Sequence, residues 1–161
     1  MNSYDQALLT QFTDLIIETC ELANWDVTAC EVSGNSTVIV INDLPIMFAV
    51  IPETKSLLFC AYLFVIEESQ KNTVFEQLLT GNHQLLQTSG MTLSYATEQG
   101  QGYAALNYCS ALTGMTPENL TNIITAFDNV ANFWTKQVST QDHAPEGDSS
   151  ENIFAKHQLL V

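Results

Sequence analysis

The sequence predicts an α+β fold in which an antiparallel sheet has helices packed on it. Three observations lead to this prediction. Residues 37–66 contain three apolar, β-rich runs separated by two turns, helical apolar periodicity flanks this block, and a later alternating stretch surrounds a glycine-rich turn. The expected order is helix, three strands, helix, two-strand hairpin, helix.

The first helix is expected from about Tyr4 to Asn24, where apolar residues recur at helical spacing. Its apolar stripe is wide, because Leu9, Ile17 and Cys20 extend it beyond the core-facing positions. Part of the apolar surface of this helix is therefore expected to remain exposed rather than buried in the core. Residues 27–33 then read as a short strand or an extended arm.

The three strands follow in close succession. The sequence places them at 38–41, 46–51 and 57–66, with breaks at Asn42-Asp43 and at the turn that starts with Pro52. Because these runs do not alternate cleanly between apolar and polar residues, we expect both faces of the sheet to be covered.

A second helix is predicted from about Thr73 to Leu86. Gly81-Asn82 interrupts its pattern, which indicates either a close approach of another backbone or a simple kink. A hairpin follows, with strands at 91–97 and 103–112. Thr116, as a cap, and Pro117, in the first turn, then start the last helix.

The chain divides by composition near residue 138. Residues 1–138 carry the periodic pattern of a folded domain, whereas 139–161 form an acidic, polar C-terminal tail that is expected to be flexible. The tail ends in an apolar stretch, Ile153 to Val161, that either docks or stays free.

The chain is strongly acidic. Eighteen Asp and Glu residues stand against four Lys and no Arg, for a formal net charge of −14. Binding to nucleic acid or to an anionic membrane needs clustered cations, which this sequence lacks. The charge therefore serves either solubility or attraction of basic partners.

The cysteines and the chain's apolar runs indicate a cytoplasmic protein. Cys20, Cys30, Cys60 and Cys109 form no CxxC pair and are expected to be reduced, mostly buried small hydrophobes. No signal peptide is visible at the N-terminus, and no apolar run approaches the ~20 residues that a membrane span needs.

The search for catalytic and metal-binding motifs finds none. His83, His143 and His157 have no partners at metal-ligand spacing, and the sequence contains no HExxH, GxSxG, phosphate-loop or GxGxxG motif. The acidic pair Glu67-Glu68 reads as a solvated strand end. We therefore expect no enzyme activity, no metal and no cofactor.

Three stretches carry a resemblance to a known family. They are Asn42-Asp43-Leu44-Pro45 before the second strand, the helix 75–82 with Leu78, Leu79 and Asn82 in an "LLxxN" pattern, and 127–134 with its late Trp. With the element order, the size and the acidity, these stretches resemble the class I type III secretion chaperones of the Tir chaperone (CesT) family. The resemblance covers about residues 4–138.

The resemblance implies an ATP-independent homodimer in the bacterial cytoplasm. Such a protein holds the extended N-terminal segment of a secreted effector or translocator in a secretion-competent state and helps deliver it to the export ATPase. The resemblance places the dimer interface on the second helix, at Phe75, Leu78, Leu79, Asn82, Leu85 and Leu86. The client surface is expected on the first helix and the strands, at Leu9, Phe12, Ile16, Val38, Val40, Met47 and Phe59.

Two alternatives stay open. One is a small α+β adaptor that binds a folded protein partner through one compact patch. The other is a small-ligand module, which needs a polar cluster between helices and sheet; its candidates are Tyr62, Tyr95, Tyr103 and Tyr108.

Overall fold

The computed structural model describes residues 3–25, 34–83, 85 and 87–141. These residues form three helices and five strands in the predicted order, so the predicted α+β fold class is confirmed. The elements are α1 (Ser3–Ala23), β1 (Ser36–Ile41), β2 (Leu44–Ile51), β3 (Ser56–Val65), α2 (Lys71–His83), β4 (Thr92–Glu98), β5 (Gln101–Ala111) and α3 (Pro117–Gln141). The stretch 27–33, predicted as a strand or arm, lies outside the described residues.

Tight turns connect the strands within each hairpin. Asn42 and Asp43 join β1 to β2, and both have positive φ, at 48° and 67°. Gln99 and Gly100 join β4 to β5 with φ values of 50° and 84°. Two-residue hairpin turns need this left-handed backbone because their twist then matches that of the strands.

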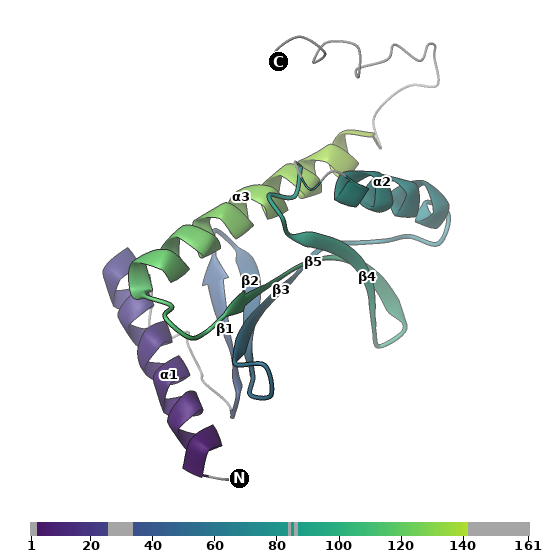
Figure 1. Ribbon diagram of the computed structural model, residues 1–161. Coiled ribbons are helices and arrows are strands. Elements are labelled where there is room, and N and C mark those ends of the chain that lie inside the picture. The colour runs from purple at the N-terminus through teal and green to yellow at the C-terminus, as the bar shows by residue number, and fades with distance from the viewer. Residues whose placement is uncertain (1–2, 26–33, 84, 86, 142–161) are drawn as a thin grey trace, which may run out of the picture.

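The five strands form one antiparallel sheet in the order β1-β2-β3-β5-β4 (Figure 1). After β3 the chain passes through α2 to the far edge, where β4 begins, and β5 returns between β4 and β3. The two edges of the sheet are therefore β1 and β4.

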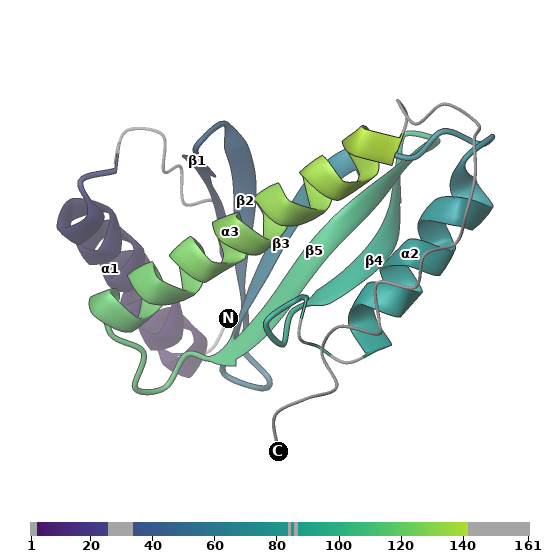
Figure 2. The same cartoon turned by 90° about the horizontal axis from the view of Figure 1, so that it is seen from above.

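All three helices pack on the same face of this sheet. Helices α1 and α3 contact each other, α3 runs diagonally across the strands, and α2 lies on β4 (Figures 1 and 2). Apolar side chains from all of these elements form one core; its largest fully buried members are Phe12, Phe48, Phe59, Phe127, Ile16, Ile39, Ile46, Leu57, Leu106, Leu112, Leu120 and Ile124.

The expectation that both faces of the sheet are covered is wrong for the described residues. Burial alternates along β1, where Ile39 and Ile41 are buried but Val38 and Val40 are exposed. The alternation is hidden in the sequence because both faces of the strand carry β-branched apolar residues. No described element covers the second face.

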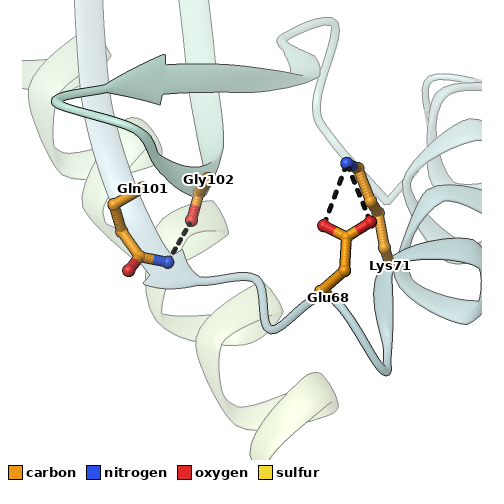
Figure 3. Close-up of polar contacts among 4 residues, drawn as sticks. All are labelled: Glu68, Lys71, Gln101 and Gly102. Carbon is orange, nitrogen blue, oxygen red and sulfur yellow. Dashed lines mark hydrogen bonds and ion pairs between the residues drawn. The ribbon is translucent and has the colours of Figure 1, made fainter.

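An ion pair fixes the connection between β3 and α2. Lys71 Nζ lies 3.2 Å from Glu68 Oε2 (Figure 3). The same ammonium group lies 5.5 Å from the centre of the Tyr95 ring. The hydrogen bond that the Lys71 ammonium group donates to the Glu68 carboxylate raises the pKa of Lys71. The Glu68 side chain is 88% exposed just after β3, which agrees with the expected solvated strand end, and it also forms this local ion pair.

Two further expectations need adjustment. Helix α3 continues to Gln141, so residues 139–141, which the sequence assigned to the tail, are helical.

Cys20 is buried and Cys60 half-buried, as expected for small hydrophobes, but Cys109 is exposed on the uncovered sheet face. Cys30 lies outside the described residues.

Candidate functional site

The uncovered face of the sheet carries a continuous apolar surface. Val38 pairs with Met47, and Met47 pairs with Cys60, so their side chains form a row across β1, β2 and β3. Val40, next along β1, is 52% exposed. Exposed apolar patches of this kind mark interaction sites more often than isolated exposed side chains do.

Aromatic and aliphatic side chains extend this surface along β3 and β5. Tyr62 stacks on Tyr103 with ring centres 5.0 Å apart, and Val65 pairs directly with Tyr103. Partial desolvation, with the negative charge of Glu98 second, raises the pKa of the Tyr62 hydroxyl. We call the surface made by Val38, Val40, Met47, Cys60, Tyr62, Val65 and Tyr103 the open sheet face.

The edge strand β1 borders the open sheet face with unpaired main chain. The Val50 N–H donates to the Asn35 carbonyl over 2.8 Å, which fixes the phase of the β1–β2 ladder. Since hydrogen-bonded positions alternate in an antiparallel pair, the N–H and C=O groups of Val38 and Val40 point away from β2. Within the described ranges, no strand pairs with them.

The other edge strand, β4, is engaged by a side chain at Leu93. Asn82 of α2 donates from Nδ2 to the Leu93 carbonyl over 2.9 Å, and the Leu93 N–H donates to Asn82 Oδ1 over 2.9 Å. At this one residue the carboxamide occupies the main-chain groups that another strand would use.

The predicted client-binding residues divide between surface and core. Val38, Val40 and Met47 lie on the open sheet face, and Leu9 is half-buried on α1, on the opposite side of the sheet. Phe12, Ile16 and Phe59 are fully buried, which corrects their expected place at the surface. Their helical and strand phases point them between α1, α3 and the sheet.

The predicted dimer residues divide in the same way. Leu79 is 71% exposed and Leu85 is also exposed, whereas Leu78 belongs to the core. Phe75 is half-buried and meets Tyr95 edge to face with ring centres 5.0 Å apart. Asn82 is engaged with Leu93. Leu86 lies outside the described residues.

Sequence reasoning missed Tyr62, Val65 and Tyr103 as members of the exposed surface. Their outward orientation depends on how β3 pairs with β5. A bulge between Tyr62 and Phe64 shifts the register of β3 against β5 and changes which side chains face outward. The apolar run 57–66 alone does not reveal such a shift.

The structure gives the small-ligand alternative no convergent cluster. Tyr62 and Tyr103 stack on the open sheet face, Tyr95 lies beside α2, and Tyr108 packs against Phe59 of the core. Within the described ranges, no three His, Cys, Asp or Glu side chains are grouped as a metal site would need. No helix among these residues has the length and apolar character to cross a membrane.

Solved structures share this fold, although no family model and no curated protein matches the sequence. A chain of the HopA1–SchA chaperone–effector complex matches with a TM-score of 0.63 at 11% identity, over 81% of this chain and 97% of that one. YbjN from E. coli, a proposed transcription regulator, gives 0.63 at 10% identity, over 81% and 93%. A chain of the ExsC–ExsE complex gives 0.56 at 16% identity, over 84% and 96%. At these identities the likeness concerns the fold, and it is a fold that a chaperone–effector complex contains.

Proposed function

We propose that this protein is a type III secretion chaperone that binds the extended N-terminal segment of a secreted effector or translocator. The observation that carries the proposal is the open sheet face beside the unpaired edge of β1. Support also comes from the shared fold with a chain of a chaperone–effector complex. The chaperone holds its client without ATP and without catalysis, in the bacterial cytoplasm.

The client segment binds as an added strand along β1. Its main chain pairs with the outward N–H and C=O groups of Val38 and Val40, and this pairing depends little on the client's sequence. Alternate client side chains then lie on the open sheet face next to Val38 and Val40, where apolar residues are preferred. The net charge of −14 keeps a protein with such a surface soluble.

The dimer is proposed to form through the outer side of α2. Leu79 on α2 and Leu85, two residues after its end, are the predicted interface residues that expose large apolar side chains. A dimer presents two copies of the open sheet face, so that one client segment can extend over both. The export ATPase is a further proposed partner, met when the client is delivered.

An adaptor for a folded partner is the second candidate. YbjN, a proposed transcription regulator, shares the fold with the same TM-score as the chain of the chaperone–effector complex, so the fold alone does not assign the chaperone function. The state of the client distinguishes them, because an adaptor needs its partner folded and a strand-adding chaperone needs it extended.

The test is co-expression with the N-terminal segment of a candidate effector encoded nearby, followed by light scattering and limited proteolysis. We expect a dimer of twice 17.8 kDa that takes up the segment and protects it from protease. Val40→Lys is expected to abolish uptake. The matched control is Leu22→Lys, since Leu22 is equally exposed but lies on α1. A monomer that ignores extended segments would contradict the proposal, and binding only to a folded partner would favour the adaptor.

A further inference from the structure

A second apolar surface lies on the helical side, around Phe133. One hollow of about 370 Å³ lies between α2 and the end of α3, where Gly81 and Trp134 are among its lining residues. A second hollow of about 430 Å³ lies farther back along α3 and includes Ala126 and Val130. Phe133 lines both hollows. We call the two hollows together the Phe133 groove.

The walls of the Phe133 groove are held in place. The Trp134 indole N–H donates to the Gln87 carbonyl over 3.2 Å, and its ring lies against Gly81, whose missing side chain makes room for it. Phe133 meets the Trp134 ring edge to face with centres 5.8 Å apart. Phe133 nevertheless stays 40% exposed, so a rigid groove offers an uncovered aromatic ring.

The chain itself contains a segment with matching chemistry. Helix α3 ends at Gln141, four residues after Gln137, which lines the first hollow. The following residues are polar until Ile153-Phe154, and a second apolar group, Leu159-Leu160-Val161, comes shortly after. Two apolar groups thus stand at the end of a polar connection that starts beside the groove.

We propose that residues 153–161 dock in the Phe133 groove of their own chain. The α3 residues that line the two hollows are centred about five residues apart, or ~8 Å at the rise of a helix. In a helical segment, Ile153 and Leu160 lie on one face about 10 Å apart, as do Phe154 and Val161. Each apolar group therefore meets one hollow, with Phe133 between them.

Reach and charge support docking within one chain. The twelve residues from Gln141 to Ile153 span up to ~40 Å, whereas the path back to Phe133 along α3 is only ~12 Å. A connection of this length within one chain gives an effective concentration of the order of mM. Lys156 is the one basic residue beyond Lys136, and Glu76 lines the first hollow, so the segment's positive charge has an acidic counterpart there.

The test is hydrogen–deuterium exchange of the full chain without any client, so its result is independent of the proposed chaperone function. In the natural sequence, amides of 153–161 are expected to exchange about tenfold more slowly than in an unstructured peptide. The double variant Phe154→Ser with Leu160→Ser, which leaves the folded body unchanged, should remove this protection. Phe133→Ala should remove it as well.

Val40→Ser on the open sheet face is the matched control and should leave the protection of 153–161 unchanged. The proposal is overturned if these amides already exchange at the unstructured rate in the natural sequence. It is equally overturned if Val40→Ser removes the protection and Phe133→Ala does not, because the segment then lies on the sheet. Protection that falls on dilution would assign the groove to a second copy and also overturn docking within one chain.

Discussion

The carboxamide of Asn82 is hydrogen-bonded in both directions to the main chain of Leu93, with both bonds 2.9 Å long. A neighbouring strand would make the same two bonds. The side chain therefore joins α2 to the outer edge of β4 and occupies that edge at Leu93. A strand that added to β4 at this residue would have to displace the carboxamide.

Asn82→Ala is expected to destabilise the protein by about 1–3 kcal/mol, because the N–H and C=O of Leu93 lose their partners in a half-buried place. Asn82→Asp keeps the acceptor for the Leu93 N–H but loses the donor to the Leu93 carbonyl. Its stability should therefore lie between that of the natural sequence and that of Asn82→Ala. Urea unfolding followed by circular dichroism measures the difference. Asn122→Ala, at an exposed position of α3, is the control and should change stability little. Equal effects at both positions would show that the Leu93 pair contributes nothing.

The order of elements was predictable because local signals determine it. Asn42-Asp43 and Gln99-Gly100 supply the left-handed turns of the β1–β2 and β4–β5 hairpins, and Thr116 caps α3 by accepting a bond from the Asn119 N–H over 3.2 Å. Such signals act over a few residues, so a single sequence displays them.

The division between core and surface was harder to predict, because it depends on contacts between distant parts of the chain. Phe59 and Cys60 are neighbours in one apolar run, yet Phe59 is in the core and Cys60 is on the open sheet face. The contact of Gly81 with Trp134 joins two helices far apart in sequence. For Gly81 the sequence allowed close approach of a backbone, whereas the structure brings an indole ring.

Gly81→Ala is expected to destabilise the protein by about 1–3 kcal/mol, although Ala is the better helix former by about 1 kcal/mol. The reason is that a Cβ at this position runs into the six-membered ring of Trp134. The measurement is chemical denaturation of the single variants and of Gly81→Ala combined with Trp134→Leu. In the Trp134→Leu background the added methyl group should cost less, since the smaller side chain can move aside. An unchanged cost in that background would refute the clash.

Thr37→Val is expected to stabilise the protein by about 1 kcal/mol. The Thr37 hydroxyl is buried in β1, and no described residue forms a hydrogen bond with it. Replacing an unpaired buried hydroxyl with a methyl group removes the cost of its desolvation. Thr19 is the matched control, because its buried hydroxyl donates to the Leu15 carbonyl over 2.6 Å. Thermal unfolding should show opposite signs, with Thr19→Val destabilising; a stability loss in both variants would contradict the assignment of Thr37.

Glu118 is expected to make stability depend on pH at the acidic end. Hydrogen bonds from its own main-chain N–H and from the Thr116 hydroxyl lower the pKa of this carboxyl from its ordinary 4.5. A lowered pKa in the folded state means that the stabilisation is present above pH 4.5 and is lost as the pH falls through the folded-state pKa.

The check is thermal unfolding of the natural sequence and of Glu118→Gln at pH values above and below 4.5. The natural sequence should be more stable above pH 4.5, and the difference should vanish at lower pH. Thr116→Ala should reduce the pH-dependent part and also lower stability by about 1 kcal/mol at every pH through loss of the cap. A difference between Glu and Gln that stays constant with pH would contradict this origin.

The free edge of β1 gives a prediction that separates folding from binding. The N–H of Val38 points away from the sheet, whereas the N–H of Ile39 takes part in the β1–β2 ladder, as the Asn35–Val50 bond requires. Proline lacks an N–H and is tolerated only on an open strand edge. Val38→Pro should therefore fold with a loss of about 1 kcal/mol, while Ile39→Pro should lose about 3 kcal/mol or more.

If a client strand adds to β1, Val38→Pro also removes one of its main-chain donors and blocks its close approach. Binding of an extended client segment, measured by calorimetry, should weaken at least about tenfold, which corresponds to 1.4 kcal/mol. Val38→Ala is the control for the lost side chain, because it keeps the N–H and should retain most of the affinity. A Val38→Pro variant that folds and binds as tightly as Val38→Ala would show that the client contacts the side chains of the open sheet face without pairing along β1.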